Sequence, residues 1–142
     1  MNILMVLTSH DRLGDTGEKT GFWLEEFAAP YYVFTDAGAQ VTVAWPNGGQ
    51  PPIDPKSDDP ANQTPAQDRF KADKSAQSVL ASTNGVDWVS ADEFDAVFYP
   101  GGHGPMEDLS ESDALGRILV AMLDDDRVIG AVCHGPAALL SA

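Results

Sequence analysis

Four short apolar runs, separated by segments of helical periodicity, are the feature that most constrains the fold of this 142-residue chain. They lie at residues 3–7, 40–45, 96–99 and 127–132. Continuous apolar runs of this length predict strands that are buried on both faces. Because strands alternate with helices, we expect parallel pairing and helices on both faces of the sheet, in one α/β domain over residues 1–142.

The segment after the first run predicts a helix rich in aromatic residues. Apolar side chains from Phe22 to Phe34 recur at helical spacing. Thr20 is expected to cap the start of this helix, because a hydroxyl there can accept a backbone N–H of the first turn. Pro30 is expected to kink the helix and Gly38 to end it.

The middle of the chain predicts a surface insertion followed by helices. Six of the ten prolines lie in residues 46–65, which predicts an extended, polyproline-like excursion. Trp45 and Ile53 are apolar anchors, so we expect this insertion to be ordered against the body or a second subunit. Residues 66–81 predict a helix in two pieces around Asp73, and residues 112–124 predict an amphipathic helix.

The charge of the chain argues against several classes of partner. Eight Lys and Arg against 22 Asp and Glu give a formal net charge of −14. Such a surface repels phosphate backbones and anionic membranes, so we expect no nucleic-acid partner and no membrane partner. No segment approaches the roughly 18 apolar residues of a membrane span, and the first residues do not have the pattern of a signal peptide. A single cysteine can form no internal disulfide, and we therefore expect a cytoplasmic protein.

The chemistry is expected at the carboxyl ends of the strands, where parallel sheets bind their ligands. Cys133 directly follows the fourth run, with Ala131 two residues before it and Gly135 two residues after it. Small residues at this spacing are typical of a nucleophile elbow, a strained turn between a strand and a helix. The start of the next helix favours a thiolate, and the N–H groups of His134 and Gly135 can meet an oxyanion beside the sulfur. A buried cysteine with no chemical role is the alternative.

A glycine-rich turn follows the third run. Gly101, Gly102, His103 and Gly104 can bring backbone amides close to a reacting oxygen. A phosphate-binding loop would need Lys with Ser or Thr after the glycines, and these are missing.

Glu26 lies near the apolar side of the aromatic helix, where a buried carboxyl can serve as acid or base beside a thiolate. A surface carboxylate is the alternative for Glu26, and Glu25 is expected to point into solvent. His10 is expected to line the same pocket from the loop after the first strand. Two histidines and a cysteine at one edge match no metal-ligand spacing, so neither a metal nor another cofactor is expected.

Three motifs occur together in this sequence: Ala-Val-Cys-His-Gly-Pro at 131–136, Pro-Gly-Gly-His-Gly at 100–104, and Thr-Gly-Phe-Trp-Leu-Glu-Glu with the following proline at 20–30. Their combination resembles the ThiJ/PfpI family of the class I glutamine amidotransferase-like superfamily. Residues 52–57 are similar to the proline-rich insertion of its chaperone and glyoxalase III branch. The resemblance implies a flavodoxin-like three-layer sandwich with a mostly parallel sheet, usually a homodimer. Family members continue further, so the resemblance also implies that C-terminal strands and the acid partner of His134 are missing here, and that these 142 residues alone act poorly.

The resemblance assigns roles residue by residue. Cys133 matches the nucleophile of the family, and His134 matches the histidine directly after it. Glu26 matches the carboxyl that hydrogen-bonds the thiol. Gly102 and the N–H of His134 match the oxyanion hole, with Gly101 beside them.

The implied function is that of a glutathione-independent glyoxalase III-like enzyme that needs no cofactor. It would convert methylglyoxal or related 2-oxoaldehydes to hydroxy acids through a hemithioacetal on Cys133, or repair their adducts on proteins. One alternative is a stress-response holdase chaperone or redox sensor, in which Cys133 is oxidised rather than turned over. Another is a cysteine amidase or peptidase, for which His134 has poor geometry because it directly follows the thiol.

Overall fold

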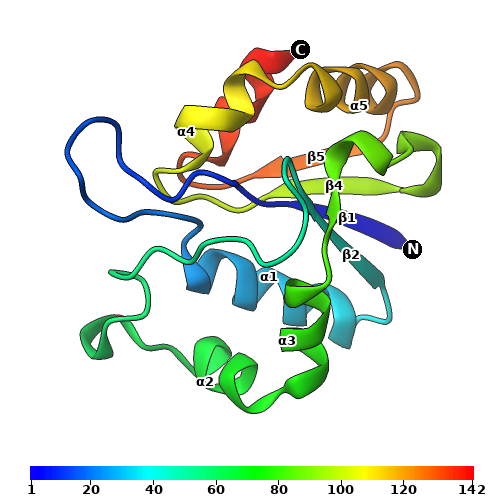
Figure 1. Cartoon of the computed structure of the whole chain (residues 1–142). Helices are drawn as coiled ribbons and strands as arrows, with labels where there is room; N and C mark the ends of the chain where they lie inside the picture. The colour runs from blue at the N-terminus through cyan, green and yellow to red at the C-terminus, as the bar shows by residue number, and fades with distance from the viewer.

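The computed structural model describes residues 1–142 and is built on a five-stranded sheet in the order β3-β2-β1-β4-β5. Figure 1 labels β2, β1, β4 and β5 of this sheet. Every pair of neighbouring strands is parallel, as expected. The strands are β1 (Asn2–Val6), β2 (Gln40–Trp45), β3 (Asn84–Gly85), β4 (Ala96–Tyr99) and β5 (Val128–Ala131). The four expected strands are confirmed, and the two-residue strand β3 was not predicted.

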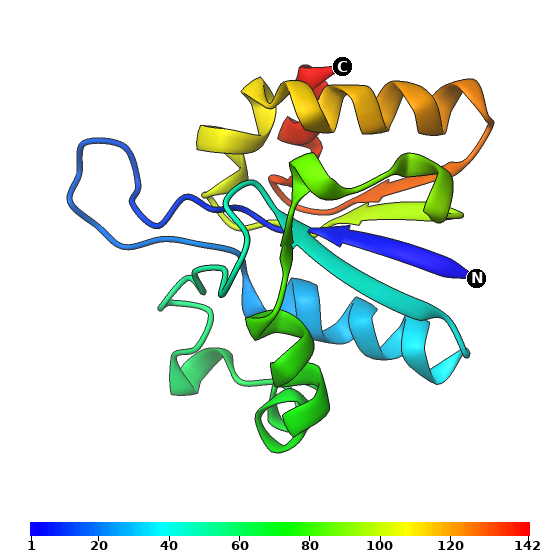
Figure 2. The ribbon, with the colours of Figure 1, turned by 45° about the vertical axis from the view of Figure 1, so that its right-hand side comes forward.

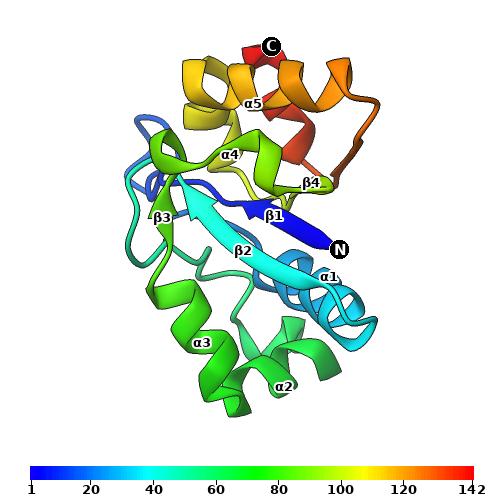
Figure 3. The ribbon, with the colours of Figure 1, turned by 90° about the vertical axis from the view of Figure 1, so that its right-hand side faces the viewer.

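Helices cover both faces of the sheet and give the three layers of a flavodoxin-like sandwich (Figures 2 and 3). The α-helices are α1 (Leu24–Asp36), α2 (Pro65–Ala72), α3 (Lys74–Ala81), α4 (Pro105–Asp108) and α5 (Asp113–Asp124). Short 3₁₀-helices are η1 (Pro60–Asn62), η2 (Val86–Trp88), η3 (Ala91–Glu93), η4 (Leu109–Glu111) and η5 (Gly135–Ser141). No helix combines the length and the apolar composition that crossing a membrane requires.

Two separate apolar cores lie on the two faces of the sheet. On one face α1, α2 and α3 surround an aromatic core, in which the Phe27 ring lies 5.4 Å from the Tyr31 ring and 5.7 Å from the Phe70 ring. On the other face the apolar side of α5 packs against β5 and shares one core with the buried side chains of β4, and Leu115 and Leu119 are fully buried there. The amphipathic pattern of residues 112–124 therefore predicts both this helix and the face that it buries.

The start of α1 differs from the sequence-based expectation. The helix begins at Leu24, and Thr20 does not cap it. The Thr20 hydroxyl donates instead to the Asp54 carboxylate, 3.2 Å away. The N–H of Leu24 donates to the Ser57 hydroxyl oxygen at 3.0 Å, so the cap comes from the insertion. Gly38, at φ +87°, ends the helix as predicted.

The insertion at residues 46–65 is ordered against the body, as predicted. It runs past the first turn of α1 (Figure 1) and forms a parallel bridge there, in which the Phe22 N–H donates to the Pro52 carbonyl at 3.0 Å. Asp54 and Ser57 are buried in this contact. The expected polyproline-like course is wrong for residues 54–62, which form turns and the 3₁₀-helix η1, because backbone and side-chain acceptors bend the chain locally.

The break between α2 and α3 falls at Asp73, as predicted. Its carboxylate caps α3 by accepting the N–H of Ala76 at 3.1 Å. The start of α5 is capped in the same way, because the Ser112 hydroxyl oxygen accepts the N–H of Leu115 at 3.4 Å. Both caps are local in sequence, which is why a pattern within a few residues can indicate them.

Candidate active site

The candidate site lies at the carboxyl edge of the sheet, around the neighbouring strands β1, β4 and β5. From β1 the chain continues to β2, and from β4 it continues to β5 on the opposite side, so β1 and β4 flank a topological switch point. Open parallel sheets bind their ligands at such points. Tyr99 and Ala131 are paired at the ends of β4 and β5, and the loops that follow these two strands therefore run side by side.

Cys133 occupies a strained turn directly after β5, as predicted. Its φ of +54° is left-handed, a conformation that is rare for a residue with a side chain. Gly135 lies against β4, because a Cβ there would come 2.3 Å from the Tyr99 carbonyl oxygen. Cys133 is exposed, so the turn presents the thiol to solvent. The expected α-helix after the turn is instead the 3₁₀-helix η5, whose hydrogen-bond geometry is poorer.

One imidazole ring lies beside the thiol, and a second ring lies next to the first. The Sγ of Cys133 is at hydrogen-bond distance, 3.4 Å, from Nδ1 of His134. The rings of His134 and His103 lie 4.9 Å apart and are tilted by 34°. The structure thus brings two of the predicted site residues together, His103 and His134, of which His134 contacts Cys133.

Glu26 reaches the same place from the first turn of α1. Its Oε2 accepts the N–H of Gly101 at 2.7 Å. A Cβ on Gly101 would lie 2.3 Å from this oxygen and 2.6 Å from the Cβ of Cys133, so the two side chains meet across the bare glycine. The expected hydrogen bond between the carboxyl and the thiol is not formed. A carboxylate binds a backbone N–H more strongly than it binds a weak S–H donor, and Gly101 offers that N–H.

Backbone donors at this edge have no partner within the chain. The N–H groups of Gly102 and His134 donate to no protein atom, which leaves them available to an oxyanion. Gly102 has φ +104°, and a Cβ there would lie 2.3 Å from the Gly21 carbonyl oxygen. Only glycine fits this position, and the close approach of the two backbones requires it.

His10 lies in the loop after β1, beside the glycine turn. Its N–H donates to the Thr8 hydroxyl oxygen at 3.0 Å. Its carbonyl oxygen would lie 3.0 Å from a Cβ on Gly104, so the loops after β1 and β4 touch. The His10 backbone therefore borders the site, and its ring forms no hydrogen bond within the chain.

The sequence did not reveal Asp108, which fixes this first loop. Its Oδ1 accepts the Thr8 hydroxyl at 2.7 Å, and its Oδ2 accepts both the N–H and the hydroxyl of Ser9, at 2.6 and 2.8 Å. The partners are about a hundred positions apart in the sequence, so no local pattern could have paired them. The expectation that Glu25 points into solvent is also wrong, because its carboxylate accepts a hydrogen bond from the Thr64 hydroxyl.

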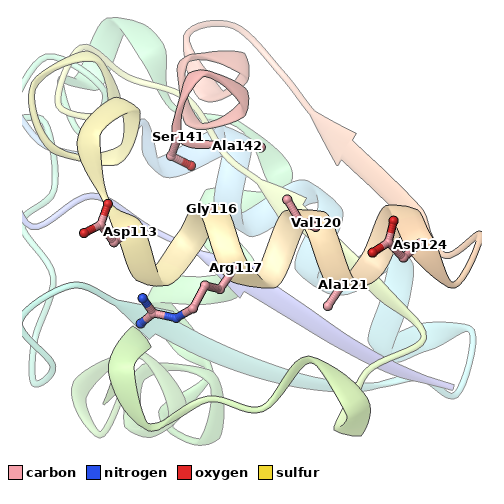
Figure 4. Close-up of a pocket in the computed structure, with 8 residues that line it drawn as sticks. All are labelled: Asp113, Gly116, Arg117, Val120, Ala121, Asp124, Ser141 and Ala142. Atoms are coloured by element: carbon pink, nitrogen blue, oxygen red, sulfur yellow. The ribbon is translucent and has the colours of Figure 1, made fainter.

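The larger hollows of the structure lie elsewhere. The one drawn in Figure 4 lies along α5 and the end of η5, and includes Asp113, Arg117 and Ser141. None of the hollows is lined by Cys133 or Glu26. No group of three or more His, Cys, Asp or Glu side chains is placed to hold a metal ion.

Comparison with known proteins agrees with this geometry. Residues 19–142 match the DJ-1/PfpI family. The protein/nucleic acid deglycase HchA of Staphylococcus aureus is 33% identical over 129 residues, which are 87% of this chain and 43% of that protein. The chain thus spans less than half the length of the curated relatives it matches.

Solved structures show the same fold. The Rapid Encystment Protein 24 KDa of Francisella tularensis superposes with a TM-score of 0.90 at 38% identity, over 97% of this chain and 60% of that one. Glyoxalase III of Candida albicans superposes with a TM-score of 0.85 at 26% identity, over 97% of this chain and 59% of that one. The predicted flavodoxin-like class is therefore confirmed.

Proposed function

The chain belongs to the DJ-1/PfpI family, and on that premise we propose that it is a glutathione-independent glyoxalase III-like enzyme with Cys133 as its nucleophile. Its substrates would be methylglyoxal and related 2-oxoaldehydes, or the adducts that these form on proteins. The observation that carries the proposal is the meeting of the Cys133 turn and the Glu26 carboxyl across Gly101. The similarity to a deglycase and to a glyoxalase III supports the same substrate class.

The first step would be attack of the Cys133 thiolate on the aldehyde carbon. A C–S bond forms, and the carbonyl oxygen becomes the oxyanion of a hemithioacetal. The N–H groups of Gly102 and His134, which have no partner within the chain, would bind this oxyanion. The thiol proton would pass to Nδ1 of His134, 3.4 Å from Sγ.

The second step would move a proton between the two substrate carbons. The Glu26 carboxylate would take the proton of the former aldehyde carbon while His134 gives its proton to the former ketone oxygen, which yields an enediolate. Glu26 would then return its proton to the former ketone carbon. The product is a thioester of lactate on Cys133. Water then breaks the C–S bond and releases lactate, so methylglyoxal and one water give lactic acid with no oxidant or reductant.

Two further properties follow from the family resemblance and belong to this proposal. Residues 1–142 would lie in a single domain of the family, with residues 46–65 as its insertion. The protein would act as a homodimer in the cytoplasm, and light scattering of the purified protein measures its oligomeric state.

The experiment that tests the proposal is lactate formation from methylglyoxal without glutathione, with and without EDTA. We expect turnover by the protein, its loss in Cys133→Ala, and a rate lower by about 10² to 10⁴-fold in Glu26→Gln, the range for a positioned acid or base. Glu107→Gln is the matched control, because Glu107 is an exposed carboxylate outside the site. Full turnover by Cys133→Ala would overturn the proposed mechanism.

A further inference from the structure

The first turn of α1, which carries Glu26, takes its cap from a distant part of the chain. Trp23 stands at the N-cap position, and its side chain accepts no hydrogen bond from the helix. The N–H of Leu24 donates instead to Oγ of Ser57, 33 positions further on and inside the insertion. The first N–H groups of a helix need acceptors from outside the helix. Ser57 supplies one of these acceptors.

Ser57 is itself held in place from two sides. Its side chain is 0% exposed, and its hydroxyl donates to the Asp54 carbonyl at 2.7 Å while it accepts from Leu24. Its own carbonyl accepts Nε2 of Gln67 at 2.6 Å, and Gln67 is also fully buried. The proton of the hydroxyl and one of its lone pairs are therefore in use, which fixes the position of Oγ.

The two residues before α1, Phe22 and Trp23, are hydrogen-bonded to the insertion on one side and to the glycine turn on the other. On one side Phe22 exchanges backbone hydrogen bonds with Pro52 and Asp54, at 3.0 and 2.9 Å. On the other side the N–H of Trp23 donates to the Gly101 carbonyl at 3.0 Å. The turn that follows is thus fixed relative to both segments.

We propose that Ser57 is a positioning residue, whose buried hydroxyl caps α1 and thereby sets the Glu26 carboxyl against Cys133. The inference rests on the proposed function, because it gives the insertion a part in placing the proton-transfer group. Leu24 is buried, so no water replaces the lost acceptor when the hydroxyl is removed. The first turn must then shift or fray to satisfy its N–H, and Glu26, two residues on, moves with it.

The test compares three single variants. Ser57→Ala removes the cap, and Ser57→Thr keeps a hydroxyl at the same position. Ser112→Ala is the matched control, because it removes the side-chain cap of α5, which carries no site residue. All three leave the titratable groups beside Cys133 unchanged: Glu26 from α1, His103 from the glycine turn, and His134.

Two readouts separate positioning from a loss of stability. The pH profile of Cys133 alkylation by iodoacetamide reads the thiol directly, because the chain has one cysteine. For Ser57→Ala we expect the midpoint of this profile to move toward that of Glu26→Gln. We also expect kcat for methylglyoxal to fall about tenfold with KM unchanged, since a full 1 Å misplacement costs on the order of 10²-fold. Ser57→Thr is expected to restore both values, and Ser112→Ala to change neither.

Two outcomes would overturn the inference: a folded Ser57→Ala protein with the wild-type alkylation profile and kcat, or equal changes in Ser112→Ala. If Ser57→Ala does not fold, Gln67→Met provides the second test. This variant removes the donor to the Ser57 carbonyl and keeps the hydroxyl, so a smaller shift of the profile in the same direction is expected, and no shift would refute the inference. If the wild-type protein fails to convert methylglyoxal, the proposed function fails, whereas the alkylation profiles still decide the role of Ser57.

Discussion

Replacing Gly101 by alanine should separate Glu26 from Cys133. The new Cβ would lie 2.3 Å from Oε2 of Glu26, 2.6 Å from Cβ of Cys133 and 2.9 Å from the carbonyl oxygen of Val132. Ordinary van der Waals contacts of a Cβ begin at 3.4 Å. The Glu26 carboxylate, the Cys133 side chain or both must therefore move by about 1 Å to restore an ordinary contact. The Val132 carbonyl moves less, because it belongs to the backbone.

The size of the effect follows from this displacement. A misplacement of about 1 Å in a catalytic group costs on the order of 10²-fold in rate. Forcing a methyl group into a filled space also costs stability, typically about 1–3 kcal/mol. We therefore expect Gly101→Ala to stay folded, to lose about 10²-fold in kcat, and to show an altered rate of Cys133 alkylation.

The assay is lactate formation from methylglyoxal, together with iodoacetamide alkylation and urea denaturation of the same samples. Gly85→Ala is the control, because the nearest atom to its new Cβ, the Pro46 carbonyl oxygen, is 3.4 Å away. This control should keep both turnover and the alkylation rate. Normal turnover by a folded Gly101→Ala protein would refute the argument that Glu26 and Cys133 act across this glycine.

Two other predictions concern the loop after β1 and the pH dependence of stability. Asp108→Asn removes the charged acceptor of the Thr8 hydroxyl, which lies in a part-buried network. Urea denaturation should show that the free energy of unfolding falls by about 1–3 kcal/mol. An unchanged urea midpoint would contradict this prediction. The N–H of Ala76 and the Tyr32 hydroxyl hold the pKa of Asp73 below 3.8, so its contribution to stability is present above pH 3.8 and is lost as the pH falls through the lowered value. Burial and Asp73 raise the pKa of Tyr32 to about 12, so the contribution of Tyr32 is complete below pH 10.0 and is lost as the pH rises through about 12. Urea midpoints over pH test both signs, with Asp73→Asn as the control that should lose the Asp73 part of the acid-side dependence and keep the part from Asp36 and Asp58, whose pKa values are lowered by Arg69 and Lys71.

The parts of the fold that the sequence predicts are those that depend on neighbours in the chain. The turn at Cys133 is indicated by small residues two positions away on each side, and at Gly135 the reason is steric, because a Cβ there would lie 2.3 Å from the Tyr99 carbonyl oxygen. The break at Asp73 is likewise indicated within three residues, where its carboxylate caps α3. Continuous apolar runs predict the four longer strands, and helical periodicity predicts the buried face of α5, for the same reason.

The parts that were missed depend on partners far away in sequence. Ser57 caps α1 across 33 positions, and Asp108 binds Thr8 across 100 positions. Thr20 has the right residue type for a cap, yet α1 begins only at Leu24, and the Thr20 hydroxyl donates to the buried Asp54. Patterns of neighbouring residues do not indicate which distant acceptor a donor will bind, because tertiary packing decides which acceptor lies close to it.

The glycines of the candidate site explain why separate motifs in the sequence point to one place. A Cβ on Gly21 would lie 2.2 Å from the Pro52 carbonyl oxygen, and a Cβ on Gly102 would lie 2.3 Å from the Gly21 carbonyl oxygen. A Cβ on Gly135 would likewise lie 2.3 Å from the Tyr99 carbonyl oxygen at the end of β4. The insertion, the approach to α1, the glycine turn and the Cys133 turn are therefore packed backbone against backbone. Each contact requires a glycine at one position, and because the requirement is steric, these positions remain visible in the sequence when the polar partners around them do not.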